Sequence, residues 1–496
     1  MPGRMEFEYR FGTSGARQPV RPDADEPFRV LVIGDLRGDA GRAAAAAPAR
    51  TIAIDADNFD AVLARLAPAL ELPGGTGDGG TTVPFRSLDD FHPDALYARL
   101  EIFRALRDMR VELLNPATFA AAFARLQGGA AAPPPPADAA QPESDTDALA
   151  RLLGRAPRDA GAAVLPGLAG LLHQVMAPHI VPGQDPRTDS VVASVDAASE
   201  GLMRAILHSP GYRALESTWR GLHRLVTSES RGEGVEVHVC DAAASGLAAD
   251  VLANKEALEH SALAQALAER ADGPGGVPWS LIVAAYTFGP GESALHTLAA
   301  LGVLAHRCGA PLVGHASPAL FGCSSFGETP SHTDWRALPE DAQVAWGALR
   351  RGPDAPWIAL AAPRVLLRQP YGRKSDPVER FTFEELPAGG AHESLPWGHP
   401  GFALAELLMA SFADSGFEME PGNHRELGEL PACTIERHGE SALVPCAEAW
   451  LSEATVNALL ERGLTAIVSV RNRPEVQVPR FQSIAEPPAP LAGPWS

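Results

Sequence analysis

The hydrophobic positions in the first 127 residues follow strand and helix spacing in turn. Three short apolar runs predict strands: Phe28–Ile33, Thr51–Ile54 and Val83–Phe85. Between and after them, apolar residues recur every three to four positions, as on the buried face of a helix. Asp57 is positioned to cap the first of these helices, whose apolar residues run from Phe59 to Leu70. Asp90 or Asp94 is positioned to cap the second, which runs to Leu113.

The second half of the chain shows the same alternation at greater length. A helical pattern extends from Leu202 to Val226 around Pro210. The strand-like runs that follow are Val235–Cys240, Trp279–Ala285, Pro311–Val313, Ile358–Leu367 and Thr465–Val470. Helical patterns lie between them, at 261–269, 293–307, 402–416 and 455–463. Strands that alternate with helices are typical of sheets covered by helices, so we expect an α/β protein of two units with mixed sheets.

A Pro-rich stretch separates these two units. Residues 128–148 read GGAAAPPPPADAAQPESDTDA, and four consecutive prolines favour an extended linker. We therefore predict a domain at 1–127, a linker at 128–148, a domain at 149–485 and a Pro-rich tail at 486–496. The tail is expected to be unpaired after Ser483.

Composition narrows the range of partners. The 496 residues include 41 basic and 61 acidic side chains, a net charge of −20, which disfavours nucleic acid as a partner. The five cysteines form no CxxC motif and their number is odd, which is typical of a reducing compartment. The first residues, MPGRMEFEYR, contain no apolar signal core, and the apolar runs are too short to span a bilayer. We expect a cytoplasmic protein without membrane insertion.

The chain contains no catalytic motif. Neither lysine, Lys255 or Lys374, follows a glycine, so the phosphate-binding Gly-Lys-Ser/Thr loop is excluded. The glycines within residues 34–41 follow a strand, but they lack the GxGxxG spacing and read as a turn. Neither GxSxG nor HExxH occurs. The adjacent acids Glu384 and Glu385 read as a solvated strand end. We predict no enzymatic activity, no cofactor and no bound metal.

Several segments contain combinations of residues that forming a helix or a strand does not by itself explain. In the second half they are ILHSPGYRALESTWRGL (Ile206–Leu222), HASPALFG (His315–Gly322), PRVLLRQPYG (Pro363–Gly372), Trp397-Gly398 before an Ala-rich helix, and Phe481–Ser483. Together they resemble the large contractile-sheath subunit of type VI secretion systems over residues 145–485. In the first half they are VIGDL (Val32–Leu36), IDADNFD (Ile54–Asp60) and FRSLDDFHP (Phe85–Pro93). These resemble the small sheath subunit over residues 26–126.

The resemblance implies a fusion, because the two subunits are normally separate chains. It also implies structural roles for the signature residues Asp35, Asp55, Asn58, Phe59, Phe91, His208, Pro210, Trp219, Arg220, Gly221, Pro318, Phe321, Gly322, Arg364, Pro370, Tyr371, Gly372, Trp397 and Gly398. Two positions depart from the family pattern. The family has a Trp-Gly-Asn motif where this chain has Trp397-Gly398-His399, and it usually has threonine where this chain has Cys446. The family's large subunit normally continues well past the segment that ends at Ser483.

The function implied is that of a structural component of a contractile apparatus. Its expected partners are other sheath subunits, the inner tube protein and baseplate proteins. In the family, a disassembly ATPase binds N-terminal helices of the large subunit, which would lie here around Leu149–His179. Pro157 and Pro166 interrupt that stretch, so that site is not carried over. The shortened C-terminus predicts a terminal or adaptor element. The alternative is a soluble, non-polymerising regulator that binds sheath, tube or baseplate proteins.

Overall fold

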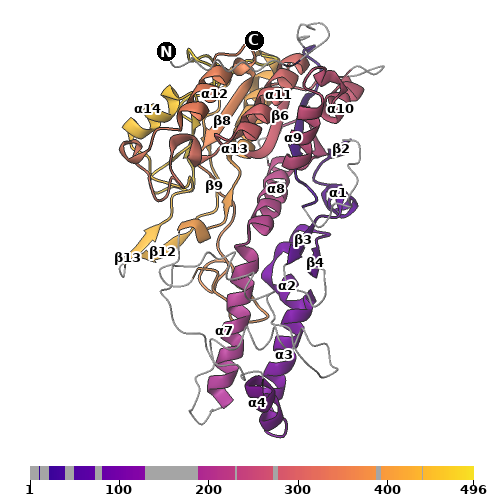
Figure 1. Cartoon of the computed structure of the whole chain (residues 1–496), viewed down its shortest axis with the longest axis vertical. Coiled ribbons are helices and arrows are strands. Elements are labelled where there is room, and N and C mark those ends of the chain that lie inside the picture. Colours follow the sequence, from indigo (N-terminus) through magenta and orange to yellow (C-terminus); the bar gives the residue numbers. More distant parts are fainter. Residues whose placement is uncertain are drawn as a thin grey trace.

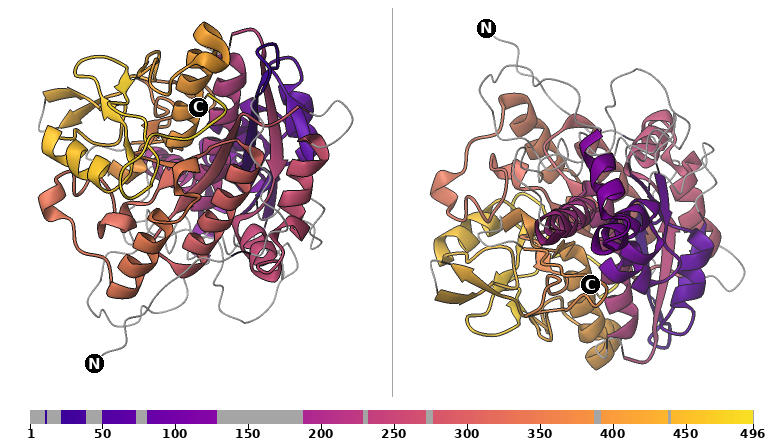
Figure 2. Two further views of the ribbon diagram at one scale, coloured as in Figure 1. Left: turned by 90° about the horizontal axis from the view of Figure 1, so that it is seen from above. Right: turned by 90° about the horizontal axis from the view of Figure 1, so that it is seen from below.

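The computed structural model describes residue 11 and residues 22–38, 50–72, 81–128, 188–228, 232–271, 277–386, 392–437 and 440–495. These residues form a head and a stem (Figure 1). The head contains the main sheet and its covering helices. The stem consists of the helices α3 (Glu101–Leu114), α4 (Phe119–Gly128) and α7 (Thr188–Leu207), which Figure 2 shows end-on from below. The predicted linker, apart from Gly128, lies outside the described residues.

A seven-stranded sheet organises the head. Its strands are β1 (Phe28–Gly34), β2 (Thr51–Ile54), β5 (Val235–Asp241), β6 (Leu281–Phe288), β7 (Leu312–Ala316), β8 (Ile358–Ala362) and β14 (Thr465–Ala466). Their spatial order is β14-β8-β7-β6-β1-β5-β2, and every neighbouring pair is parallel except β2 with β5. Strand β1 therefore lies inside a sheet that is otherwise built mostly from the second half of the chain. Phe28 pairs with Val235 on one side, and Val30 pairs with Leu281 on the other.

Both faces of this sheet are buried, which explains the continuous apolar run in β1. Val30 and Val32 belong to the core on one face, and Leu31 and Ile33 belong to the core on the other. A parallel strand covered on both sides needs apolar residues at every position. The first face is covered by α8 (Pro210–Thr227) and α13 (Pro400–Ser415). The second is covered by α9 (Ala244–Ala253), α10 (Ala262–Ala271), α11 (Glu292–Cys308), α12 (Glu340–Arg350) and α14 (Glu453–Glu461). The predicted α/β class with mixed sheets and flanking helices is confirmed.

The remaining described strands and helices are short. Strands β3 (Ala69–Leu72) and β4 (Thr81–Pro84) pair, as do β9 (Val365–Leu366) and β10 (Trp397–Gly398), and β12 (Thr434–Arg437) and β13 (Glu440–Leu443). A third small sheet holds β11 (Glu426–Leu427), β16 (Val476–Gln477) and β15 (Val468–Ser469). The short helices are α1 (Phe59–Leu66), α2 (Pro93–Arg99) and the 3-10 turns η1 (Leu88–Phe91), η4 (Leu258–His260), η5 (Pro318–Phe321), η6 (His332–Asp334), η7 (Ala355–Trp357), η8 (His392–Ser394) and η9 (Gly416–Glu418).

Element boundaries differ from the predicted ones where polar capping or proline intervenes. The second predicted helix is two helices, α2 and α3, because the backbone is extended at Leu100. The pattern around Pro210 is also two helices, because Ser209 caps α8 and Pro210 occupies its first turn. Helix α1 is preceded by Asn58 rather than Asp57, and Leu70 lies in β3 instead of on the helix.

The C-terminal residues pack against the head, so the expectation of an unpaired tail is wrong. The Ile484 N–H donates to the Ile358 carbonyl at 2.9 Å, and the Ala492 N–H donates to the Pro356 carbonyl at 2.9 Å. Ile484, Leu491 and Trp495 are buried. The prolines of this stretch remove backbone donors but do not prevent apolar packing between them.

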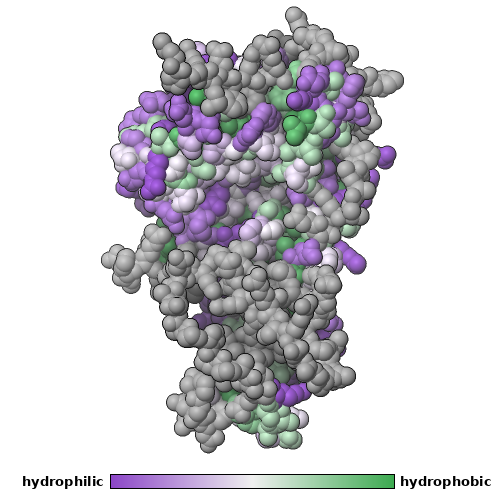
Figure 3. All heavy atoms as spheres, in the orientation of Figure 1, coloured by the Kyte–Doolittle hydropathy of each residue, from purple (hydrophilic) through white to green (hydrophobic). Residues whose placement is uncertain are grey.

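The tip of the stem has an apolar surface. Val111 is 65% exposed and Leu114 is 50% exposed at the end of α3, and Figure 3 shows apolar atoms at this lower end, over α4. Among the described residues, no helix combines the length and the hydrophobicity that a membrane span requires.

Candidate functional site: the junction of two segments

The first part of the junction is made by main-chain hydrogen bonds to β1. We call described residues 22–128 the N-terminal segment and 188–495 the C-terminal segment. Strand β1 pairs with β5 and β6, and two further hydrogen bonds extend this pairing. The Ser280 N–H donates to the Arg29 carbonyl at 2.8 Å, and the Ala242 N–H donates to the Gly34 carbonyl at 2.9 Å. A Cβ at Gly34 would lie 2.9 Å from the Cβ of Ala285, so the close approach of β1 and β6 there requires glycine.

Two aromatic side chains of α8 reach across to the N-terminal segment. The indole N–H of the fully buried Trp219 donates to the Leu36 carbonyl at 3.0 Å. Its ring meets the Phe59 ring edge to face, with centroids 5.7 Å apart. Two helical turns before Trp219 on α8, the Tyr212 hydroxyl donates a hydrogen bond to the Phe91 carbonyl. Each aromatic thus buries a large surface and also satisfies a buried backbone carbonyl of the other segment.

Helix α2 docks on the loop formed by residues 370–386. The Asp94 carboxylate accepts hydrogen bonds from the Glu379 and Arg380 N–H groups at 3.0 and 2.9 Å. The Tyr97 ring stacks on Phe381, with centroids 4.2 Å apart and planes 13° apart. The position of this loop therefore decides whether α2 finds its partners.

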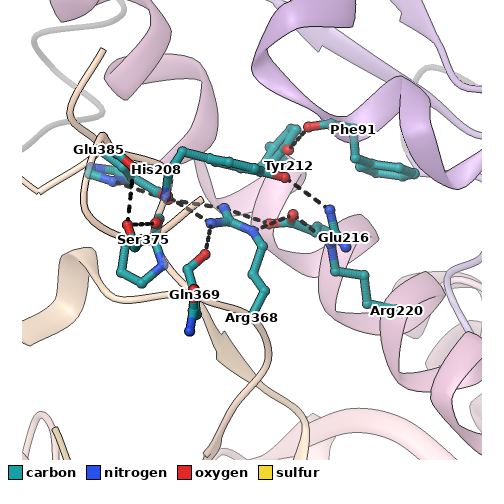
Figure 4. A network of polar contacts seen from close by, with 12 residues as sticks. Phe91, His208, Tyr212, Glu216, Arg220, Arg368, Gln369, Ser375 and Glu385 are labelled. Carbon is teal, nitrogen blue, oxygen red and sulfur yellow. Dashed lines mark hydrogen bonds and ion pairs between the residues drawn. The ribbon is translucent and has the colours of Figure 1, made fainter. Parts of the chain in front are cut away.

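That loop is held by a buried ion-pair network centred on Arg368 (Figure 4). The guanidinium donates to Glu216 at 2.7 and 3.2 Å and to Glu385 at 2.7 and 3.0 Å. Both contacts are bidentate, which suits the planar geometry of arginine. Glu216 belongs to α8 and Glu385 to the end of the loop, and all three side chains are almost completely buried.

Two further side chains enlarge the network. Arg220, one turn after Glu216 on α8, donates to that carboxylate at 2.9 Å and to the Tyr371 hydroxyl at 2.9 Å. The Tyr371 N–H donates to Glu385 at 2.8 Å. The Arg368 guanidinium also lies 4.1 Å from the centre of the Tyr371 ring. The network thus ties α8 to both ends of the 370–386 loop.

The charges in the network balance. Burial alone would raise the pKa of Glu216, but Arg368 and Arg220 hold it below its ordinary value. His208 lies 3.8 Å from Glu385. Burial, together with Arg213 and Arg368, lowers the pKa of His208 to about 3, so this imidazole is neutral at physiological pH. Two guanidinium groups therefore face two carboxylates. Such a network specifies one arrangement, and removing a single member is costly.

A second ion-pair cluster surrounds Arg364. Its guanidinium donates to Glu448 at 2.7 Å and to Glu393 at 2.9 Å. Burial would raise the pKa of Glu448, but His392, whose Nε2 lies 3.7 Å away, and the hydrogen-bonded Arg364 guanidinium lower it to about 2. Ligand-type atoms of His392, Glu393 and Glu448 lie within 4.8 Å of one another. Because Arg364 already donates hydrogen bonds to both carboxylates, the arrangement fits an ion-pair cluster better than a metal centre.

The signature residues of the N-terminal segment fall into two groups. Asp35 and Asp55 close turns, since the Asp35 carboxylate accepts from Gly38 N–H at 2.7 Å and that of Asp55 from Asn58 N–H at 2.9 Å. Phe59 and Phe91 are buried and contact the aromatic rings of α8.

The signature residues of the C-terminal segment lie partly at the junction and partly outside it. His208, Trp219, Arg220 and Tyr371 meet there. Pro370 and Gly372 flank Tyr371 in the same loop. The others lie further away: Pro210 at the start of α8, Gly221 against Phe402, Pro318 and Phe321 in the turn η5 with Gly322 directly after it, Arg364 in its own cluster, and Trp397 and Gly398 in β10.

Sequence reasoning missed the acids of the junction. Glu385 is 1% exposed and pairs with Arg368, so its expected place at a solvated strand end is wrong. Glu384 is partly exposed and contacts Arg373. For Glu216 a signal existed: it lies within the apolar stripe of α8, one turn before Arg220. An acid in such a stripe points to a buried pair.

Residues 189–485 match the family VipB, described as EvpB/VC_A0108, tail sheath N-terminal domain, and this match covers more than half of the chain. Residues 2–122 match the family described as Type VI secretion system, VipA, VC_A0107 or Hcp2. The chain belongs to the type VI secretion sheath family. It is a fusion of a small-subunit-like and a large-subunit-like part, as the motifs predicted.

Two curated relatives from Pseudomonas aeruginosa match the two parts. The sheath protein TssC1 is 28% identical over 308 residues, which are 60% of this chain and 61% of the relative. The sheath protein TssB1 is 34% identical over 122 residues, which are 23% of this chain and 69% of the relative. The chain thus spans 61% of the length of TssC1. Both relatives are named as type VI secretion system sheath proteins.

Proposed function

We propose that this chain is a subunit of a type VI contractile sheath in which one polypeptide supplies both the small and the large part. The observation that supports this most directly is the position of β1 between β5 and β6. A strand that is hydrogen-bonded on both sides leaves only when the sheet opens, so the two parts move as one body. Covalent linkage fixes their ratio at one to one and raises their mutual concentration to the order of millimolar.

The proposed partners follow from this role. They are other sheath subunits, the inner tube protein and baseplate proteins, all in the cytoplasm. The net charge of −20 argues against nucleic acid as a partner. Binding of a disassembly ATPase stays a prediction, and the stretch 149–179 that would carry it lies outside the described residues.

Cleavage of the linker tests the proposed pairing. A protease site is inserted near Pro135, and the cut protein is run on a sizing column at micromolar concentration. We expect both fragments to elute together at the position of the uncut chain, because β1 and the aromatic contacts of α8 remain in place. The same cut sample in denaturant is the control and gives two separate fragments. Separate elution under native conditions would contradict the proposal.

The finer role, a terminal or adaptor element, is a second proposal, and the non-polymerising regulator is its alternative. Electron microscopy of the purified chain, alone and mixed with assembled sheath from separate small and large subunits, separates them. Discrete particles that bind sheath ends support the terminal role. Long regular tubes of the chain alone contradict that role but agree with a sheath subunit. Discrete particles that bind only the sides of a sheath, the tube or the baseplate favour the regulator.

A further inference from the structure

The hydrogen bonds by which Trp219, Tyr212 and Asp94 join the two segments all involve main-chain atoms of the other segment. Trp219 and Tyr212 donate to the carbonyls of Leu36 and Phe91. The Asp94 carboxylate accepts from two main-chain N–H groups of the 370–386 loop. Every polypeptide of the same fold offers these main-chain groups, whatever its side chains are. A choice between similar partners therefore depends on contacts between side chains.

Ion pairs provide such contacts, and they all have the same polarity. Among the described residues, three ion pairs join the two segments: Arg29–Glu236 at 2.7 Å, Arg37–Asp241 at 3.5 Å and Arg110–Asp196 at 2.7 Å. In each pair the arginine belongs to the N-terminal segment and the acid belongs to the C-terminal segment. The two segments thus meet as positively and negatively charged partners at three separate points, which is the pattern of electrostatic complementarity.

Two of these pairs lie at opposite ends of the ladder between β1 and β5. Arg29 is directly opposite Glu236 near the start of the ladder, and Asp241, which pairs with Arg37, is the last residue of β5. Both strands are largely apolar, and a slip of the register by two positions would keep each side chain on its own face of the sheet. The apolar pattern alone therefore specifies the register weakly. Such a slip would separate both ion pairs, so the charges at the two ends distinguish the observed register.

The exposure of these pairs indicates that they select a partner more than they stabilise it. The Arg29 side chain is 13% exposed, and that of Glu236 is 44% exposed. Both side chains of the Arg110–Asp196 pair are more than one third exposed. Water therefore replaces much of what is lost when one member is neutralised. A partner with the opposite polarity is different, because like charges would then face each other at every point and repel.

We propose that Arg29, Arg37 and Arg110 are specificity-determining residues of the pairing. The C-terminal segment accepts a small-subunit-like part that carries arginines at these positions and rejects one that carries acids there. This inference rests on the proposed sheath role, in which the two parts pair, and adds the chemistry by which the partner is chosen. It also gives the fused chain a means to exclude separate small subunits whose charges at these positions differ.

Charge reversal in the intact chain is the first test. The variants use two of the three pairs, because Asp241 also accepts a main-chain hydrogen bond. We expect Arg29→Glu with Arg110→Glu to raise the unfolding equilibrium constant at least about tenfold. Adding Glu236→Arg and Asp196→Arg should recover most of this loss, and the neutral Arg29→Gln with Arg110→Gln should lose less. A fourfold variant no more stable than the double reversal, or a double reversal no worse than the neutral variant, would overturn the proposal.

A competition experiment measures the choice of partner directly. Chains cut at a protease site near Pro135 are unfolded, mixed and refolded, and the resulting pairs are counted by mass spectrometry. A limiting amount of wild-type N-terminal fragment is offered equal amounts of wild-type and charge-reversed C-terminal fragment. At low salt we expect at least about a tenfold preference for the wild-type fragment. The reversed N-terminal fragment should show the opposite preference, and both preferences should shrink at about 1 M salt. Equal pairing with both fragments would overturn the proposal.

Arg125→Glu is the matched control for Arg110→Glu. Arg125 is an exposed arginine of the stem, but its ion-pair partner, Glu112, belongs to the same segment. The control changes the net charge equally and should leave the preference for the wild-type C-terminal fragment unchanged. A preference altered as much as by Arg110→Glu would show that net charge decides, and would refute the proposal. If the cut wild-type fragments do not pair at all, the proposed sheath pairing fails, whereas the intact-chain variants still decide this inference.

Discussion

The N-terminal and C-terminal segments meet in the head and again in the stem, and the two contacts differ in their exposure to water. In the head, the ion pairs of Arg368 lie within the C-terminal segment and hold the loop on which α2 docks; their N···O distances are 2.7 Å, and the side chains involved are at most 7% exposed. In the stem, Arg110 of α3 and Asp196 of α7 approach to the same 2.7 Å, but their side chains are 41% and 42% exposed. The N···O distance alone therefore does not show which of these ion pairs stabilises the protein more.

The physical difference lies in what surrounds the charges. Water screens the exposed pair and solvates its members equally well when they separate, so the pair adds little stability. In the head, a charge that loses its partner has no water to replace it. The head junction should therefore decide whether the two segments hold together, while the stem adjusts more freely. The following substitutions test this contrast.

The largest effect is expected for Arg368→Met, which leaves the carboxylates of Glu216 and Glu385 buried without their shared cation. We expect a loss of about 5 kcal/mol in the free energy of unfolding, measured by denaturant titration. The loss should shrink as the pH falls. In the wild type the pKa of Glu216 is lowered, so its stabilising contribution is lost on acidification. In the variant, protonation instead relieves the buried charges. A difference that stays constant from neutral pH to about pH 4 would contradict this account.

Trp219→Ala should cost about 3–5 kcal/mol, because it empties a fully buried site and leaves the Leu36 carbonyl without its donor. Trp450→Ala is the control, since this tryptophan is 46% exposed and its removal should change stability by no more than about 0.5 kcal/mol. Thermal and denaturant unfolding of both variants give the comparison. Equal effects of the two substitutions would mean that Trp219 does not join the segments.

Tyr212→Phe isolates a single hydrogen bond of the head junction. The ring and its contacts with Phe85 and Phe91 remain, but the Phe91 carbonyl loses the hydroxyl that donates to it. We expect destabilisation by about 1–3 kcal/mol, the cost of an unsatisfied buried acceptor. An unchanged denaturation midpoint would show that water replaces the hydroxyl and that this part of the junction is wet.

The smallest effect is expected in the stem. Arg110→Ala removes the exposed pair with Asp196 and should cost only about 0.2–1 kcal/mol, and less at high salt. Asp196→Asn is the reciprocal variant and should behave alike. If either change rivalled Arg368→Met, the contrast between head and stem would be wrong.

The sequence predicted the strands and helices well where apolar spacing alone decides them. Strand β2 has the predicted bounds, and β1 and β5 differ from prediction by one residue at the end. Boundaries set by capping or proline were missed, because periodicity continues through Leu100 and Pro210 while the backbone does not. The C-terminal prolines likewise suggested a free tail, although Leu491 and Trp495 between and after them are buried.

By itself the sequence determined the α/β class and the presence of two sheath-like parts in one chain, because apolar spacing and linear motifs are local properties. Only the tertiary structure decided that β1 enters the sheet of the C-terminal segment, since the parallel pairing of distant strands leaves no local signal in either strand. The same holds for Arg368, Glu216 and Glu385. Glu216 and Arg368 are 152 positions apart in the chain, and their charges looked ordinary until folding removed the water around them. Burial, which depends on the whole fold, turns these common side chains into the centre of the junction.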